Sequence, residues 1–231
     1  MLYLAMTAGE FHSCRELPGK IAWMACHFSP YGTGLTNLPR KLPAGSLLIL
    51  NDRTPIHGHD AGLIRDTLAE VVEAQACGGL LLDLQRPGCD EATEVVRALV
   101  DLPCPVAVSA PYVPEDGTVF LPPVPILTPL ETYLEPWHGR KIWLDLAPET
   151  TTVTVTEAGA SILPHPGRVL PPLPHRDEEL ALHYGSELSP EAARFTLQRT
   201  RADLEELLKR GKAHGVTTAV GLYQELADFI P

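Results

Sequence analysis

The chain has 231 residues, 45% of them hydrophobic and 20% charged, so it can form one large core and does not have the composition of a disordered protein. Its formal net charge of −11 argues against a nucleic-acid-binding or membrane-surface protein. No apolar stretch approaches about 18 residues and the N-terminal sequence lacks the pattern of a signal peptide, which predicts a cytoplasmic protein.

The five cysteines favour the same compartment. They are odd in number, form no CxxC pair and mostly stand beside apolar runs. Small buried thiols explain this usage better than disulfides or a zinc site.

Eight short apolar runs predict the main strands. Several are apolar on both alternating faces, as in a parallel sheet that helices cover. The runs are residues 21–28, 46–52, 78–84, 105–111, 118–127, 141–147, 179–185 and 216–223. They predict an irregular (β/α)8 barrel of the TIM type, one domain over residues 1–231, with an open doubly wound sheet as the alternative.

Three segments predict helices between these strands. Residues 60–76 carry an apolar face with Asp60 as N-cap, and residues 90–100 repeat the arrangement over a shorter length. Residues 190–213 begin with Ser189 and Pro190 and carry leucines at helical spacing. Residues 30–45 and 111–118 are rich in Gly, Pro and Thr, so these two crossovers are expected to be loops.

Proline and β-branched residues mark the remaining segments. Of the 23 prolines, nine lie between Pro103 and Pro136 and five between Pro164 and Pro174, which indicates extended chain and fixed turns there. The sequence TTTVTVTEAGASILP over residues 150–164 predicts a β-hairpin inserted after the sixth strand.

In such a barrel the functional residues lie where strands end at the carboxyl face. Each could also serve structure alone, as a cap or in a salt bridge. The polar residues that end the apolar runs are His27 and Ser29; Asn51, Asp52 and Arg53; Asp83, Gln85 and Arg86; Tyr112; Asp145 and Glu149; His183, Tyr184 and Glu187; Tyr223, Gln224 and Glu225.

The run GGLLLDLQRP is the most informative strand, because alternation places Leu81, Asp83 and Gln85 on one side. The run resembles the signature Asp-x-x-Asp-x-Asp-x-Glu on the fourth strand of glycoside hydrolase family 18, the chitinase-like barrels. In this resemblance Asp83 stands at the last Asp and Gln85 at the Glu, while Leu81 and Gly78 replace the other two aspartates. The resemblance implies a TIM barrel that hydrolyses or binds a carbohydrate.

Gln85 cannot be the catalytic acid, because an amide does not donate a proton as a carboxylic acid does. One hypothesis is therefore a sugar-binding barrel without turnover. The other is a glycoside hydrolase with a different carboxylate pair, for which Asp83, Asp145 and Glu225 are the catalytic candidates, with Glu149 and Glu187 as further carboxylates. Separations of about 5–5.5 Å or 6.5–9.5 Å between the two carboxyls would indicate retaining or inverting chemistry.

Aromatic side chains near strand ends or in loops could stack on sugar rings, or could instead seal the ends of the barrel. They are Tyr31, Tyr112, Trp137, Tyr184 and Tyr223. We take Gln85, Tyr112, Tyr184 and Tyr223 as the candidates for binding a small-molecule or oligosaccharide ligand. The oligomeric state is left open.

His57 and His59 form a His-x-His pair, which in an amidohydrolase-like barrel would bind zinc. The pair follows Thr54 and Pro55 in an expected loop, and further ligands do not follow in order, so no metal is expected. The chain also lacks a G-x-G-x-x-G or Walker-type glycine loop and a G-x-S-x-G elbow. We therefore expect no cofactor and no acyl-enzyme chemistry.

Overall fold

A computed structural model describes residues 1–31, 33–56, 58–166 and 170–227. Its contacts divide the chain into two compact units. The first, here the barrel unit, comprises Met1–Pro122, Arg140–Asp145 and Thr217–Tyr223. The second, here the sheet unit, comprises Pro123–Gly139, Leu146–Val216 and Gln224–Pro231. That all 231 residues behave as one domain stays a prediction.

The main sheet contains a closed barrel of parallel strands, as the sequence predicts. In barrel order the strands are β1 (Leu2–Met6), β2 (Ile21–Phe28), β4 (Leu47–Asn51), β5 (Gly79–Asp83), β6 (Val106–Ser109), β7 (Thr118–Leu121), β8 (Ile142–Asp145) and β14 (Val216–Leu222). β1 pairs in parallel with both β14 and β2, which closes the barrel. β3 (Leu35–Thr36) adds a short antiparallel strand to β2.

One of the eight strand predictions is wrong. Residues 179–185 do not enter the barrel: β12 (Leu182–Leu188) belongs to the antiparallel sheet of the other unit. Leu182 is buried there, whereas the C-terminal half of the strand is exposed, as in a sheet with one solvated face. The eighth barrel strand is β1, with the short sequence LYLAM, which the apolar runs do not predict.

Two of the three predicted helices are confirmed. α2 (Ala61–Ala74) begins after Asp60, whose Oδ1 accepts hydrogen bonds from the backbone N–H groups of Gly62 and Leu63 at 2.8 and 3.0 Å. α3 spans Asp90–Leu99. As expected, neither residues 30–45 nor residues 111–118 form a helix in the described parts of these segments. The remaining helices are short: α1 (Ala8–Ser13), α4 (Leu130–Leu134), the 3-10 helix Glu135–Trp137 and α6 (Tyr223–Leu226).

The prediction of one helix over residues 190–213 is wrong in its first half. Strand β13 (Ala192–Arg199) precedes helix α5 (Arg201–Lys212). Ser189 does not cap a helix; its Oγ accepts the N–H of Ala192 at 3.0 Å in the turn between β12 and β13. β13 pairs with β9 (Glu149–Thr156) on one side and β12 on the other, and this pairing overrides the leucine spacing.

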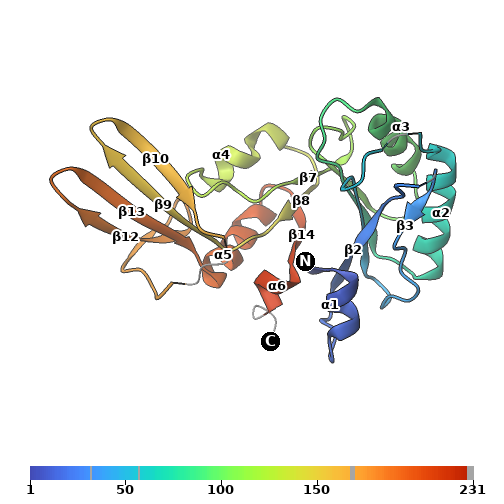
Figure 1. The fold of residues 1–231 in the computed structure, drawn as a ribbon, viewed down its shortest axis with the longest axis horizontal. Coiled ribbons are helices and arrows are strands. Elements are labelled where there is room, and N and C mark those ends of the chain that lie inside the picture. The colour runs from blue at the N-terminus through green and yellow to red at the C-terminus, as the bar shows by residue number, and fades with distance from the viewer. Residues whose placement is uncertain (32, 57, 167–169, 228–231) are drawn as a thin grey trace. The chain divides into compact units, whose positions relative to one another are not determined.

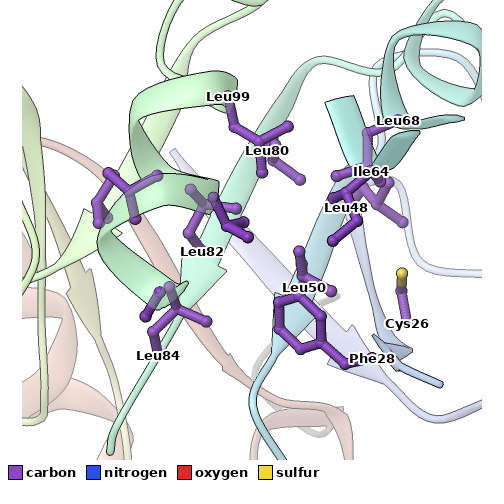
Figure 2. Packing of buried hydrophobic residues seen from close by; sticks show 14 of the residues in the cluster. Cys26, Phe28, Leu48, Leu50, Ile64, Leu68, Leu80, Leu82, Leu84 and Leu99 are labelled. Carbon is purple, nitrogen blue, oxygen red and sulfur yellow. The ribbon is translucent and has the colours of Figure 1, made fainter. Parts of the chain in front are cut away.

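Outward-facing leucines attach the helices to the barrel. Leu80 and Leu82 of β5 and Leu48 and Leu50 of β4 belong to one buried cluster with side chains of α2 and α3 such as Leu68 and Leu99 (Figure 2). The alternate residues of these strands, including Ile49 and Leu81, form a second cluster inside the barrel. Because both faces of each strand are buried, the strands read as continuous apolar runs.

The sheet unit is built on a five-stranded antiparallel sheet in the order β10-β9-β13-β12-β11 (Figure 1). The predicted hairpin is confirmed as β9 and β10 (Gly159–Pro164), which pair from Thr156↔Gly159 to Thr151↔Pro164. β11 covers His175–Asp177. No helix in the described part of the chain is both long and apolar enough to cross a membrane.

Candidate functional site

A cavity of about 440 Å³ lies at the carboxyl ends of the barrel strands. Its apolar wall includes Met24, Ile49, Leu81, Phe120 and Leu222. Its polar lining residues are Thr7, His27, Asn37, Asn51, Asp52, Arg53, Asp83 and Asp145. Active sites of TIM-type barrels form at this end, so the cavity is the candidate active site.

Strand alternation explains why polar groups gather there. Ile49, Leu81 and Trp143 face the inside of the barrel and pack in one buried cluster. Two residues later on the same strands stand Asn51, Asp83 and Asp145, so they continue the inward-facing rows at the carboxyl end. The interior of the barrel is therefore apolar up to its last layer, which is polar.

The loops that follow β4 and β5 are held together by Asp52. This side chain is only 7% exposed, and its Oδ2 accepts the backbone N–H groups of Gln85 and Arg86 at 3.0 and 2.8 Å. On the other side, Nδ2 of Asn51 donates to the carbonyls of Met24 and Cys26, both at 3.2 Å. Both carbonyls lie in the stretch of β2, between Trp23 and Cys26, where the register of its pairing with β4 shifts. The cavity wall thus has a fixed backbone.

Asp83 has the electrostatics of a proton donor. Burial raises the pKa of this carboxyl, and the negative charge of Asp52 raises it further. Hydrogen bonds from Gln85 and Ser109 oppose the shift without cancelling it, and the Gln85 Nε2 donates directly to Asp83 Oδ1. A carboxyl with a raised pKa keeps its proton to higher pH, as a general acid requires.

The structure brings two of the predicted catalytic carboxylates to this cavity. Asp83 and Asp145 both line it, and each is half-buried. Gln85 is exposed and acts on the site through its bond to Asp83. Among the aromatic candidates of the barrel unit, the Tyr112 hydroxyl donates to the Arg86 carbonyl and accepts the Cys89 N–H at 3.2 Å, which braces the loop after β5.

The other sequence candidates lie elsewhere. The hydroxyl of Tyr223 lies 3.5 Å from the Cys14 Sγ. Tyr184 belongs to the sheet unit, where its ring packs against His175 with 5.2 Å between ring centres. Glu225 is also in the sheet unit, in a cavity of about 290 Å³ that Glu149 lines as well, and burial raises the pKa of Glu225.

The sequence assigns no catalytic or binding role to several of the lining residues. His27, Asn51, Asp52 and Arg53 do end apolar runs, but nothing in the sequence distinguishes them from strand-end residues with structural roles. Thr7 is not predicted from the sequence, because β1, the strand that precedes it, is not predicted. The alternation of Tyr3, Ala5 and Thr7 was the available signal.

The metal alternative gains no support. His57 lies outside the described residues, and His59 Nε2 lies 3.2 Å from the Ser29 carbonyl oxygen, in a ring contact with Phe28. In the part of the chain that the structure describes, no group of three or more His, Cys, Asp or Glu side chains could hold a metal ion. The absence of a metal or cofactor stays a prediction.

Comparison with known proteins finds no matching family pattern and no matching curated sequence. Among solved structures, the chain is similar to the spore cortex-lytic enzyme SleL of Bacillus cereus, with 10% identity, a TM-score of 0.49, and coverage of 95% of this chain and 69% of that one. A chitinase from Chromobacterium violaceum ATCC 12472 is 9% identical, with a TM-score of 0.49 and coverage of 95% of this chain and 93% of that one. SleL of Bacillus megaterium QM B1551 is 9% identical, with a TM-score of 0.43 and coverage of 76% of this chain and 55% of that one. The chain thus spans about half of that enzyme.

A chitinase, the kind of protein that the segment 78–85 resembles, is thus among the proteins to which the chain is similar. Similarity at this level concerns the path of the chain at most. The function is argued below from the site alone.

Proposed function

We propose that the barrel binds an oligosaccharide in the cavity at its carboxyl end and hydrolyses a glycosidic bond there. The observation that carries the proposal is the Asp83 carboxyl, which has a raised pKa and lines this cavity together with a second carboxyl, Asp145. Two carboxyls with different tasks are the usual requirement of glycoside hydrolysis.

The lining of the cavity suits a sugar. A sugar ring has apolar faces and a rim of hydroxyl groups. The cavity provides Phe120 and Leu222 as apolar wall, and carboxylate, amide and imidazole groups as hydrogen-bonding partners. Its volume of about 440 Å³ falls within the range of about 300–1,000 Å³ that is usual for small-molecule sites.

In the reaction, Asp83 donates its proton to the glycosidic oxygen as the bond to the anomeric carbon breaks. The carboxylate left on Asp83 then keeps the hydrogen bond from the Gln85 amide, which stabilises the charged form. Asp145 is the second carboxylate, and it attacks the anomeric carbon or activates a water molecule according to its separation from Asp83. Asp52 positions the loop that carries Gln85.

A sugar-binding barrel without turnover is the second candidate function. It is favoured by Gln85, which stands where the chitinase-like signature has its acidic Glu. In that case Asp83 and Gln85 would serve only as hydrogen-bonding partners for sugar hydroxyls.

A glycan array followed by an assay of reducing-sugar release on each bound glycan tests the proposal. We expect binding and release by the wild type, and a loss of release of about 100-fold or more in Asp83→Asn with binding retained. Asp66→Asn is the matched control, because Asp66 lies on the exposed face of α2 with 65% of its side chain exposed, paired with Arg65. Binding without release supports the second candidate, whereas no binding to any glycan contradicts both.

A further inference from the structure

Arg53 is a cation in the lining of a cavity that also contains the carboxylates Asp83 and Asp145. The two carboxylates end strands β5 and β8, whereas Arg53 lies in the loop two residues after β4. From this arrangement we infer that the cavity selects sugars that carry an anionic group, which Arg53 binds. The inference rests on the proposed function, because it names the class of sugar for the same site.

The backbone of Arg53 is held on both sides. Its N–H donates to the Asn51 Oδ1 at 3.1 Å, and its carbonyl accepts a hydrogen bond from the Arg86 Nη2 at 3.0 Å. Asn51 is itself fixed by its two bonds to carbonyls of β2. A side chain that starts from an ordered backbone loses less conformational entropy when it binds a ligand.

The charge of Arg53 is left for a ligand. Across the described ranges, the side chain of Arg53 takes part in none of the ion pairs or hydrogen bonds, and it is exposed. Within the described residues the preceding carboxylate, Asp52, forms no ion pair with Arg53; it is 7% exposed and accepts two backbone N–H groups. An arginine without a carboxylate partner in the wall of a cavity is suited to bind an anion.

Arg86 is a second cation in these loops, outside the lining of the cavity. Its guanidinium donates to the Arg53 carbonyl, so both guanidinium groups belong to the same pair of loops after β4 and β5. An anionic group would be repelled by the Asp145 carboxylate, and by the negative charge that Asp83 takes on once it has donated its proton. The anionic group of the sugar therefore lies toward Arg53, and the scissile bond toward Asp83. The planar guanidinium of arginine donates two parallel hydrogen bonds to a carboxylate, and it can also donate to a sulfate.

Calorimetric titration with matched pairs of oligosaccharides tests the inference. Oligogalacturonides and hyaluronan fragments are each compared with their carboxyl-reduced, neutral forms, and chondroitin sulfate fragments with their desulfated forms. We expect the wild type to bind the acidic member of at least one pair about tenfold or more tightly than the neutral one. The pairs that show this preference distinguish a carboxylate from a sulfate.

Variants of Arg53 test whether this side chain causes the preference for the acidic sugar. In Arg53→Gln the preference for the acidic member disappears, and Arg53→Lys retains only part of it, because an ammonium lacks the planar pair of donors. Arg97→Gln is the control: it removes one positive charge from an exposed position of α3 outside the cavity and leaves the preference intact.

Two results overturn the inference: no acidic preference in any pair, or a preference that survives in Arg53→Gln. If neutral sugars bind and no pair shows a preference, the inference fails and the proposed function stands. If no sugar of either kind binds, both fail.

Discussion

The barrel unit contains a half-buried aspartate and the sheet unit a fully buried one, and their surroundings shift the two pKa values in opposite directions. In the barrel, burial raises the pKa of Asp83, and a neighbouring negative charge adds to the effect. In the sheet unit, burial also acts to raise the pKa of Asp203, but hydrogen bonds from Thr200 and His183 outweigh it, and the pKa is lowered. The surroundings thus favour the protonated form of an aspartate in one unit and the ionised form in the other.

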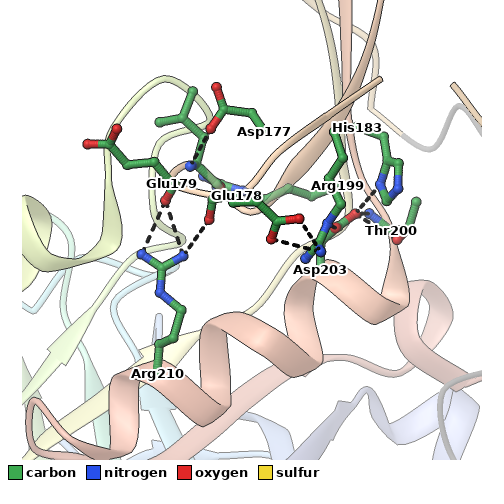
Figure 3. Close-up of polar contacts among 10 residues, drawn as sticks. Asp177, Glu178, Glu179, His183, Arg199, Thr200, Asp203 and Arg210 are labelled. Atoms are coloured by element: carbon green, nitrogen blue, oxygen red, sulfur yellow. Dashed lines mark hydrogen bonds and ion pairs between the residues drawn. The ribbon is translucent and has the colours of Figure 1, made fainter. Parts of the chain in front are cut away.

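The surroundings of Asp203 show how the anion is held (Figure 3). Its side chain is 0% exposed, and its Oδ2 accepts bonds from the Thr200 N–H, the Thr200 hydroxyl and the His183 Nδ1 at 2.8, 2.7 and 3.0 Å. Arg176 adds a guanidinium nitrogen 3.6 Å from the other oxygen. Asp203 links the start of α5 to strands β11 and β12.

The comparison distinguishes two reasons for burying a charge. A charge that is surrounded by donors stabilises the fold, whereas a charge that is poorly compensated costs stability and is kept where chemistry needs it. We therefore expect substitutions of Asp203 and Asp83 to change stability in opposite directions.

Asp203→Ala gives the largest expected effect. The change leaves the N–H and hydroxyl of Thr200 and the His183 side chain without their common acceptor, and among the described residues it removes one of the two ion pairs of Arg176. Breaking a buried charged pair of this kind costs about 3–5 kcal/mol in the free energy of unfolding. Because the pKa in the folded state is lowered, the contribution of Asp203 is present above the ordinary aspartate pKa and is lost as the pH falls through the lowered value.

Urea denaturation followed by far-UV circular dichroism and by tryptophan fluorescence measures this cost. Trp23 and Trp143 are buried in the barrel unit, so fluorescence reports mainly on the barrel. If the chain is one domain, as the sequence predicts, both signals shift together. Glu205→Ala, at an exposed position of α5 paired with Arg201, is the control and changes stability by less than about 1 kcal/mol. A variant of Asp203 as stable as this control would contradict our account of the sheet unit.

The barrel could be predicted from the sequence because its strands are buried on both faces. Runs such as residues 46–52 and 78–84 are apolar throughout, and no other common element has that pattern at such a length. The sheet unit is harder to predict from the sequence. β13 has half-buried side chains, and what keeps it from being helical is its pairing with β9 and β12, which is a property of tertiary structure.

The candidate site was predictable only in part, for a similar reason. Asp83 and Asp145 end buried strands and could be identified by position alone. What makes Asp83 different from other strand-end carboxylates is its burial, together with the charge of Asp52. Asp52 directly follows β4, and Asp83 ends the neighbouring strand β5, 31 positions later in the chain. Sequence pattern does not reveal which residues of adjacent loops meet, so neither the pKa of Asp83 nor the role of Asp52 could be foreseen.

Asp83→Asn should be more stable than the wild type at neutral pH. The carboxyl has a raised pKa in the folded state, so its favourable contribution is present below the ordinary aspartate pKa and is lost as the pH rises through the raised value. Asparagine does not ionise and avoids this loss. We expect a gain of about 0.5–2 kcal/mol at pH 7.

Denaturation curves of wild type and Asp83→Asn between pH 4 and pH 8 measure the difference. The gain should grow as the pH rises from the ordinary aspartate pKa to the raised one and stay constant above it. A gain that is equal at all pH values would mean that ionisation of Asp83 is not its cause, and a loss of stability at pH 7 would contradict the comparison with Asp203.

Asp52→Asn should shift the pH dependence of hydrolysis. In the proposed reaction Asp83 acts while it is protonated, so the rate is expected to fall as the pH rises through its pKa. Removal of the negative charge of Asp52 lowers that pKa, which moves the alkaline limb of the rate profile to lower pH. The measurement is kcat against pH for wild type, Asp52→Asn and the control Asp66→Asn. An unshifted limb in Asp52→Asn would show that Asp52 only holds the loop through its bonds to Gln85 and Arg86.

Glu131→Gln gives the smallest expected effect and shows how far exposure weakens a charge pair in the sheet unit. Arg210 donates to both carboxylate oxygens of Glu131, at 2.6 Å for the shortest bond, and this pairing lowers the pKa of Glu131. The Glu131 side chain is 43% exposed, however, so solvent screens the pair. Arg210 also keeps its bonds to the carbonyls of Glu178 and Glu179 in the variant. We therefore expect a loss of only about 0.5 kcal/mol in urea denaturation at pH 7, reduced further by salt. A loss as large as that of Asp203→Ala would mean that burial does not separate the two carboxylates.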